Sequence, residues 1–492
     1  MVADFARRRA ETTPDRIAFV EVASGQSFSY REFDDRADRA AALFRGLGIS
    51  SGDRIATLTL NEVAFFEILV AAARIGAIVV PLNWRLAADE LVPILADCSP
   101  RLLVHDGANE TMARRLSAPG LSLTDYEARI ATAPPYVHRA ESWPADGVWY
   151  LLYTSGTTGR PKAVVQTFGM AEANHVNLSH AIGLTAEDRT LSFLPLFHTA
   201  GINLHTLPTL ISGGTVTIFP KFDADRVIAA IGSGQVTCFF GVPAVYQALA
   251  QHPRFASLNL GRVRSWASGG APLPESLLHA FLTRGARVCA GYGMTETGPT
   301  LCLMDPGSVE ARVGSSGKAQ TLSQVRIVDD RGRDVPAGMP GEVLVKGANV
   351  TPGYWNNEAA TRAAFTADGW LKTGDVGRLD EDGYVTIVDR LKDMFISGGE
   401  NVYPAEVERA LLAHPEVLEA AVIGVADERW GEVGRAFVVP RADARPEPER
   451  LRAFCRARIA GYKVPQTILV VSDLPRTAAG KVQKHLLRAR TD

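Results

Sequence analysis

Residues 54–82 read RIATLTLNEVAFFEILVAAARIGAIVVPL, and this stretch decides the fold class. Residues 54–60 form a short apolar run typical of a buried strand, and residues 62–74 have the composition and length of a helix. The apolar run 77–80 then predicts a second strand. A strand, a helix and another strand in immediate succession indicate a parallel sheet covered by helices, which is an α/β fold.

The same alternation continues on both sides of this stretch. The spacing predicts helices over 33–47, 89–96 and 224–231, and strands over 101–104, 149–153 and 236–240. Between residues 323 and 388 the texture changes to short β-rich runs at 324–328, 341–345 and 383–388. Gly, Asp and Pro separate these runs, which predicts a small β-barrel or a β-rich subdomain. The last hundred or so residues mix helix and strand again, with residues 404–412 as the clearest helix.

Length and composition narrow the classes of protein to consider. A chain of 492 residues exceeds one compact core, so we expect two or more domains. A net charge of -2 gives no reason to expect nucleic acid or an anionic membrane as partner. The longest apolar stretch is interrupted by Glu67 and Arg74, which argues against a transmembrane segment.

Cysteine usage and the first residues bear on location. The five cysteines are scattered and form no CxxC pair, which favours reduced thiols over a disulfide framework or a zinc site. The opening residues have no apolar run of signal-peptide type. We therefore expect a cytoplasmic protein.

The segment YTSGTTGRPK at residues 153–162 follows an apolar strand and has the makings of a phosphate clamp. Its glycines permit tight turns with exposed N–H groups, its hydroxyls donate hydrogen bonds, and its lysine supplies positive charge. It is not a Walker A loop, and GYGMTE at 291–296 fails the GxGxxG pattern because Glu296 replaces the third glycine. By itself the segment is equally compatible with an ordinary Ser/Thr/Gly surface loop.

Five further motifs occur in a characteristic order after this segment. They are GYGMTE at 291–296, KTGD at 372–375, DRLKD at 389–393, SGGENVYP at 397–404 and PRTAAGK at 475–481. With them, the chain from about Phe5 to Arg488 resembles the adenylate-forming superfamily of acyl-CoA synthetases, aryl-CoA ligases, luciferases and peptide-synthetase adenylation domains. The DRLKDM and SGGENVYP motifs are most similar to the fatty and aryl acyl-CoA synthetase branch.

The resemblance implies an ATP-dependent ligase that adenylates a carboxylic acid and transfers the acyl group to coenzyme A. It implies a large N-terminal domain of helix-covered sheets with a β-rich subdomain, over 1–391. A small mobile α+β domain over 392–492 would follow, with Lys392 as the hinge. Rotation of this domain would replace Lys481 with residues 397–399 at the active site.

The resemblance also assigns nucleotide and metal roles. Asp375 would bind the ribose hydroxyls, Arg390 would lie in the same region, and Thr295 would contact the α-phosphate. Glu296 would hold Mg²⁺, which needs only one carboxylate beside phosphate oxygens and water. The remaining expected ATP contacts are Thr154, Ser155, Gly156, Thr157, Thr158, Gly159, Lys162, Gly269, Gly270, Ala271, Gly291, Tyr292, Gly293 and Met294. From the residues alone, Asp375 could equally be a turn aspartate and Arg390 a surface ion pair.

Lys481 is the most important catalytic residue of the implied mechanism. A fixed cation between the substrate carboxylate and the α-phosphate stabilises the charge that develops in the transition state. By composition alone it could belong to an exposed basic tail, since Lys484, His485 and Arg488 follow.

The resemblance places coenzyme A on the small domain. Ser397, Gly398 and Gly399 would line the pantetheine channel, where larger side chains would block the thiol. Trp430 would stack on the coenzyme A adenine, although a half-buried structural tryptophan is an equal alternative.

The acid is expected to be apolar. His198 would position its carboxylate, and histidine there argues against an α-amino acid. The expected slot is lined by Phe197, His198, Asn203, Phe239, Phe240, Val242, Gly269, Gly291 and Met294, which suits a fatty, aryl or polycyclic monocarboxylate. The matched segments contain no arginine for a second carboxylate, although Arg262 and Arg264 lie near them in sequence and leave a malonate-type acid open.

Two departures from the family pattern and two rival functions remain. Ala163 replaces a usual glycine, and Gln166 begins a segment that lacks a common histidine. An added methyl could displace the phosphate loop, which puts nucleotide affinity most at risk. The acceptor could instead be the pantetheine of a carrier protein, with luciferase-type oxygenation as a remote variant. A non-catalytic adenylate-binding relic is the alternative outside enzymes.

Overall fold

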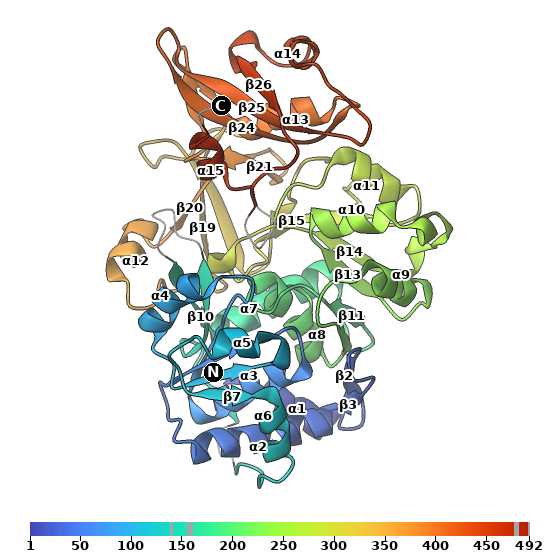
Figure 1. Ribbon diagram of the computed structural model, residues 1–492, viewed down its shortest axis with the longest axis vertical. Helices are drawn as coiled ribbons and strands as arrows, with labels where there is room; N and C mark the ends of the chain where they lie inside the picture. The colour runs from blue at the N-terminus through green and yellow to red at the C-terminus, as the bar shows by residue number, and fades with distance from the viewer. Residues whose placement is uncertain (138–140, 155–160, 477–481, 491–492) are drawn as a thin grey trace. The chain divides into compact units, whose positions relative to one another are not determined.

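The fold is seen in a computed structural model, which describes residues 1–137, 141–154, 161–476 and 482–490 (Figure 1). The chain divides into two compact units. The first comprises residues 1–324 and 345–371, and the second comprises residues 325–344 and 372–492. The expected α/β class with several helix-covered sheets is confirmed, whereas the mobile boundary between 391 and 392 stays a prediction.

A six-stranded sheet in the first unit contains the stretch from which the fold class was predicted. Its order is β10-β9-β5-β4-β6-β7. Its strands are β4 (Arg54–Leu58), β5 (Ile78–Pro81), β6 (Leu102–His105), β7 (Gly120–Ser122), β9 (Val148–Thr154) and β10 (Lys162–Thr167). All neighbours are parallel except β9 and β10, which form an antiparallel hairpin. The strand, helix and strand predicted over 54–82 are therefore present, with α3 (Val63–Ile75) as the helix.

Two further sheets complete the first unit, together with a short pair of β1 (Val2–Ala3) and β8 (Ser142–Trp143). One has the order β11-β12-β2-β3 and contains β2 (Ile17–Glu21), β3 (Ser27–Ser29), β11 (Arg189–Ser192) and β12 (Thr215–Ile218). The other runs from β13 to β17 in chain order: β13 (Cys238–Gly241), β14 (Ser265–Ser268), β15 (Val288–Tyr292), β16 (Cys302–Leu303) and β17 (Lys318–Ala319). Because β13, β14 and β15 are parallel, their carboxyl ends share one edge.

The first unit contains several α-helices, and α2 (Tyr30–Gly46) begins at a clear sequence signal. In α2, the Ser29 hydroxyl accepts from Glu32 N while the Glu32 carboxylate accepts from Ser29 N, a complete capping box. The others are α1 (Phe5–Thr12), α4 (Ala88–Cys98), α5 (Glu110–Ala113), α6 (Leu123–Ile130), α7 (Phe168–Ile182), α8 (Thr206–Ser212), α9 (Ala224–Gly232), α10 (Pro243–Gln251), α11 (Glu275–Leu282) and α12 (Glu358–Ala364).

Helix α3 is buried along its whole length, which explains its almost uninterrupted apolar sequence. Its two charged side chains have charged partners. Arg36 lies 2.5 Å from the Glu67 carboxylate, and the Tyr126 hydroxyl donates to the same group at 2.9 Å. The fully buried Arg74 pairs with three acids, Asp4 at 2.9 Å, Asp38 at 2.8 Å and Asp34.

The second unit contains two sheets. Most residues of the first sheet belong to this unit; its order is β18-β19-β20-β21, with β18 (Ser323–Val328), β19 (Gly341–Gly347), β20 (Leu371–Leu379) and β21 (Val385–Arg390). The expected β-rich subdomain is thus an open four-stranded path. The second sheet has the order β23-β22-β25-β24 with β26 beside β25: β22 (Phe395–Ser397), β23 (Glu400–Val402), β24 (Val417–Asp427), β25 (Gly431–Pro440) and β26 (Thr467–Val470).

Strand β24 alternates its side chains between two small cores. Val422 packs in a cluster with residues of α13 (Pro404–Leu412) and α14 (Pro448–Arg456). Ala421 and Ile423 pack in another cluster with Leu487 of α15 (Lys484–Arg488). The helix predicted over 404–412 is confirmed.

Two general findings bear on the expectations from composition. Within the described ranges, no helix combines the length and apolarity needed to cross a membrane. All five cysteines carry free thiols and are buried.

Replacing Arg74 with methionine should destabilise the first unit strongly. The change removes the cation that Asp4, Asp34 and Asp38 share in the interior, and breaking a buried ion pair in this way costs about 3–5 kcal/mol. Chemical denaturation measures the loss. The matched control is Arg31→Met, which breaks the exposed Arg31–Asp15 pair and should change stability by less than ~1 kcal/mol. Equal effects of the two substitutions would contradict this account.

Candidate active site

The carboxyl ends of β13, β14 and β15 bring together several residues predicted to line the acyl and adenine sites. A Cβ added to Gly269 would lie 3.4 Å from the Phe240 ring and 3.4 Å from the Gly291 carbonyl oxygen. A Cβ on Gly270 would lie 3.6 Å from Val242. Phe240 thus lies against a wall of backbone, where the glycines allow a flat group to approach closely.

Phe239 does not belong to this wall, which corrects the predicted slot. Successive side chains of a strand point to opposite faces of its sheet. Phe239 is fully buried on the other face, where its ring lies 4.9 Å from Trp266 and 5.9 Å from Tyr246. It supports the sheet from behind.

His198 lies in the connection between β11 and an unusual π-helical turn over Ala200–Leu204. The turn is tight: Gly201 N donates to His198 O, and a side chain on Gly201 would collide with the carbonyl oxygens of Leu194 and Pro195. The His198 ring lies 5.6 Å from the Phe197 ring, so these two predicted residues are adjacent. Such turns often mark functional sites.

Asn203, from the same turn, has a supporting role in place of the predicted pocket role. Its carboxamide oxygen accepts from the Tyr150 hydroxyl at 2.7 Å, and its nitrogen donates to Thr199 at 3.0 Å. The side chain is buried with both polar atoms satisfied by the protein. It holds the turn that carries His198.

One of the two arginines that left a malonate-type acid open, Arg264, is already paired. The Arg264 guanidinium lies 2.7 Å from the buried Asp188 carboxylate, which also accepts from the Thr237 hydroxyl. Burial alone would raise the pKa of Asp188, but the hydrogen bonds from Arg264 and Thr237 hold that pKa at about 2. Arg264 is therefore paired with an internal carboxylate, although its own side chain is 44% exposed, and Arg262 is exposed as well.

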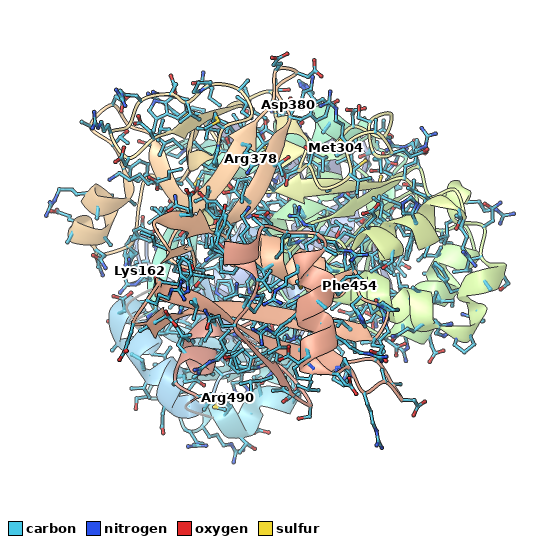
Figure 2. All side chains as sticks on the ribbon, turned by 90° about the horizontal axis from the view of Figure 1, so that it is seen from above. Lys162, Met304, Arg378, Asp380, Phe454 and Arg490 are labelled. Carbon is cyan, nitrogen blue, oxygen red and sulfur yellow. The ribbon has the colours of Figure 1, made fainter. Side chains whose placement is uncertain are left out.

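The expected phosphate clamp connects the two strands of a hairpin. Thr154 ends β9 and Lys162, which is labelled in Figure 2, begins β10; the two residues are cross-strand partners. The intervening predicted contacts Ser155, Gly156, Thr157, Thr158 and Gly159 lie outside the described residues. Ala163 points its methyl group into the core beneath the sheet, so the departure from glycine enlarges that core.

Glu296 lies in a short turn, Thr295–Thr297, that follows the segment Gly291–Met294. The carboxylate is almost buried and accepts from the Tyr354 hydroxyl at 3.0 Å. Thr351 N donates to Glu296 O at 2.8 Å. The buried Gln166, at the second departure from the family pattern, donates to Thr295 O at 2.9 Å. Gln166 thus fixes the backbone of the predicted α-phosphate contact.

The donor set at Glu296 fits magnesium. Within the described part of the chain, no group of three or more His, Cys, Asp or Glu side chains is placed to enclose a metal ion. Mg²⁺ commonly takes one or two carboxylates and completes its shell with phosphate oxygens and water. A single carboxylate beside a polyphosphate site therefore suits Mg²⁺ better than a metal that needs a protein cage.

In the second unit, Asp375, which is predicted to bind ribose, faces Arg390, which is predicted to lie in the same nucleotide region. Asp375 on β20 and Arg390 on β21 are cross-strand partners, with 3.2 Å between guanidinium and carboxylate. Asp375 is buried to 6% exposure, and its N–H donates to the Thr373 hydroxyl. The ion pair orients the Asp375 carboxylate, and the place of Arg390 in the nucleotide region stays a prediction.

The predicted coenzyme A residues also meet in the second unit. Gly398 N donates to Trp430 O at 2.8 Å, and a Cβ on Gly398 would lie 2.8 Å from the indole ring. Ser397 is the partner of Gly431 across β22 and β25. Trp430 is 39% exposed, with the Arg429 guanidinium 5.0 Å from its ring. An exposed indole beside a glycine pair can offer a flat surface to a heterocycle.

The structure describes the predicted hinge residue, Lys392, but not the predicted catalytic residue, Lys481. Lys392 is exposed. Lys481 lies outside the described residues, but helix α15 begins three positions later and is held by ion pairs. Lys484 pairs with Glu408 at 2.7 Å and Arg488 pairs with Asp393 at 3.0 Å. The segment that follows Lys481 is therefore attached to α13 and to the DRLKD motif.

The segment 349–354 was missed in the sequence. Asn349 donates to Thr297 O at 2.6 Å, and Thr351 and Tyr354 contact Glu296. No periodicity marks this segment, and its partners lie more than fifty positions away. The run of polar and aromatic residues between two β-rich stretches was the only local signal.

Two protein-family profiles and several curated proteins match this chain. The profile of the AMP-binding enzyme family matches residues 6–355, and that of the AMP-binding enzyme C-terminal domain matches residues 406–481. The chain is 42% identical to a feruloyl-CoA synthase from Amycolatopsis sp over 486 residues, covering 98% of this chain and 97% of that protein. It is 38% identical to an indoleacetate–CoA ligase from Aromatoleum aromaticum, covering 94% and 93% of the two chains.

Among solved structures, the chain is similar to o-succinylbenzoate CoA synthetase (MenE) from Bacillus subtilis in complex with the acyl-adenylate intermediate OSB-AMP. The TM-score is 0.90 at 33% identity, and the match covers 99% of this chain and 98% of that one. The likeness therefore extends over both units and over every motif named above.

Replacing Gly398 with alanine should weaken the use of coenzyme A and spare adenylation. The added Cβ would press on the Trp430 ring, and the backbone there has a φ of +61° that alanine disfavours. We expect the KM for coenzyme A to rise at least ~10-fold, because small displacements of a binding group are costly. Pyrophosphate exchange should stay near the wild-type rate.

The control for backbone strain is Gly383→Ala. Gly383 has a φ of +84° in the same unit, but an added Cβ there has nothing within 4 Å. It should lose a similar ~1–2 kcal/mol of stability without changing the KM for coenzyme A. A shift of that KM in both variants would show that strain alone is responsible.

Proposed function

Because the chain belongs to the AMP-binding enzyme family, we propose that it is an AMP-forming acid–thiol ligase that converts an apolar, preferably aromatic, monocarboxylate into its coenzyme A thioester. Both family segments match in order, and the relatives named above are CoA ligases aligned over nearly the whole chain. Cytoplasm is the proposed location, in keeping with five free, buried thiols.

In the first half-reaction, a carboxylate oxygen of the acid attacks the α-phosphorus of ATP. A P–O bond forms to the acid, the bond to the β-phosphate bridge breaks, and pyrophosphate leaves with the bonding electrons. Lys481 would stabilise the charge on the phosphoryl oxygens, and His198 would position the acid. Asp375 would hold the ribose through its two acceptor oxygens. Mg²⁺, held through Glu296, supplies charge neutralisation on the triphosphate.

In the second half-reaction, the thiolate of coenzyme A attacks the acyl carbonyl carbon. The thioester bond forms, the acyl–oxygen bond breaks, and AMP leaves. Ser397, Gly398 and Gly399 would admit the pantetheine arm, and Trp430 would receive the adenine ring. We propose that rotation about Lys392 exchanges Lys481 for these residues between the two steps.

The acid class rests on one observation above all: a Cβ added to Gly269 would lie 3.4 Å from the Phe240 ring and 3.4 Å from Gly291 O, so an aromatic ring packs beside glycine backbone there. A slot with an aromatic ring and flat backbone favours planar apolar groups. Arg264 is bound by Asp188, which disfavours a second carboxylate on the substrate. Two of the relatives, a feruloyl-CoA synthase and an indoleacetate–CoA ligase, are named for aromatic acids.

Pyrophosphate exchange over a carboxylate panel tests the proposal. The panel contains arylpropenoic, arylacetic, benzoic, fatty, dicarboxylic and amino acids, with a no-acid control. We expect the highest kcat/KM with a planar aromatic monocarboxylate and at least ~10-fold less with dicarboxylic acids, since a buried unpaired carboxylate is costly. The best acid is then offered with coenzyme A or with a set of carrier proteins. Exchange with none of the acids, or transfer only to a carrier, would contradict the proposal.

Lys481→Ala should separate the two half-reactions. We expect adenylation to fall ~10²–10³-fold, because one preorganised cation at the developing charge is lost. Thioester formation from presupplied acyl-adenylate should keep most of its rate, since that step does not use the cation. Lys484→Ala, which breaks the ion pair with Glu408, serves as a neighbouring control for loosening of the C-terminal segment. Wild-type rates in both half-reactions of Lys481→Ala would remove the assignment.

A further inference from the structure

Tyr354 contacts two charged groups that the proposed function assigns to ATP. Its hydroxyl donates to a Glu296 carboxylate oxygen at 3.0 Å. The ammonium nitrogen of Lys162 lies 5.3 Å from the centre of its ring, within the range of a cation–π interaction. One side chain therefore touches the carboxylate proposed for Mg²⁺ and the lysine proposed for the phosphates.

The backbone of Tyr354 is fixed to strand β10, which carries Lys162. Tyr354 and Val164 form an antiparallel bridge. On either side of it, Val165 N donates to Gly353 O at 3.1 Å and Trp355 N donates to Ala163 O at 2.9 Å. These backbone hydrogen bonds therefore hold the Tyr354 ring beside the hairpin formed by β9 and β10.

The hydroxyl is chemically suited to act as a constant donor. A phenolic hydroxyl is a hydrogen-bond donor, and here it donates to the Glu296 carboxylate at 3.0 Å. The hydrogen bond from Tyr354 engages one carboxylate oxygen of Glu296. It also restricts the side-chain rotation of Glu296, which would otherwise be lost only on metal binding.

We propose that Tyr354 is a positioning residue that orients Glu296 for Mg²⁺ through its hydroxyl and Lys162 for the phosphates through its ring. This inference rests on the proposed function, because that function assigns ATP and Mg²⁺ to these two groups. It assigns two separate roles to one side chain. The hydroxyl affects Mg²⁺ binding through Glu296, and the ring affects the binding of metal-free ATP through Lys162.

The test is equilibrium binding of ATP to the full chain at a series of free Mg²⁺ concentrations, including EDTA. Tyr354→Phe keeps the ring and removes the hydroxyl. We expect the Mg²⁺ concentration that gives half of the metal-dependent gain in affinity to rise ~10-fold, the order expected for a hydrogen bond to a charged group. The Kd for ATP in EDTA should stay within ~2-fold of wild type.

Tyr354→Leu removes the ring as well. We expect it to show the same shift in Mg²⁺ dependence and, in addition, a ~3–5-fold weaker Kd for ATP in EDTA, as expected from losing a partly exposed cation–π contact. The difference between the two variants isolates the contribution of the ring. An unchanged Kd in EDTA for Tyr354→Leu would overturn the proposed role toward Lys162.

The matched control is Tyr126→Phe. Tyr126 also donates its hydroxyl to a buried glutamate of the same unit, Glu67, at 2.9 Å, but it lies on α6 and has no part in the site. It should leave both ATP binding and its Mg²⁺ dependence unchanged. If Tyr126→Phe shifted the Mg²⁺ dependence as Tyr354→Phe does, general loosening of the unit would explain the result and the inference would fall.

The outcomes separate this inference from the proposed function. If wild type binds ATP in neither EDTA nor Mg²⁺, the proposed function itself fails. If wild type binds ATP with a clear gain from Mg²⁺ and Tyr354→Phe shows the same Mg²⁺ dependence, the proposed function stands and the positioning role of Tyr354 is wrong.

Discussion

The turn Thr295–Thr297 is held by segments that lie far from it in sequence, and the candidate ATP site depends on this arrangement. A buried carboxylate is unfavourable unless it receives hydrogen bonds. The Glu296 carboxylate receives one from the Tyr354 hydroxyl, while Thr351 N donates to the main-chain oxygen of the same residue. Gln166 and Asn349 fix the flanking residues of the same turn. The carboxylate is thus oriented before any ligand arrives, which lowers the ordering entropy lost on binding.

Other buried charged side chains of the first unit also have hydrogen-bond or ion-pair partners. Arg74 is surrounded by three aspartates, and Glu67 by Arg36 and Tyr126. These groups lie on helix α3 and its neighbours, at a distance in sequence from the proposed chemistry. Their role is to make an almost wholly apolar helix compatible with a single packing arrangement. Glu296 differs because the ring centre of its partner Tyr354 also lies 5.3 Å from the Lys162 ammonium.

Much of the fold could be predicted because its signals are local. The periodicity over 54–82 and the helix at Pro404–Leu412 were correct to within one or two residues, since apolar spacing directly reflects which face is buried. The barrel alternative was less accurate, because short strands separated by turns look the same in an open sheet and a closed one. The effect of Ala163 could not be predicted from its motif, because its methyl group lies in a core formed by residues distant in sequence.

The site was harder to predict than the fold. Motifs predicted roles for Glu296, Asp375 and Gly398, and these stay predictions. Motifs could not distinguish Phe239 from Phe240, because both faces of β13 are apolar and tertiary packing decides which face each side chain takes. Asn203 looked like a pocket residue only because its partners Tyr150 and Thr199 were unknown.

Of the seven tryptophans, Trp430 has the most accessible indole, since the structure places the other six in buried or half-buried positions. Its emission should therefore be the most sensitive to water and to dissolved quenchers. The chain thus carries an intrinsic optical reporter at the edge of Gly398, and no dye needs to be attached to follow events at that surface.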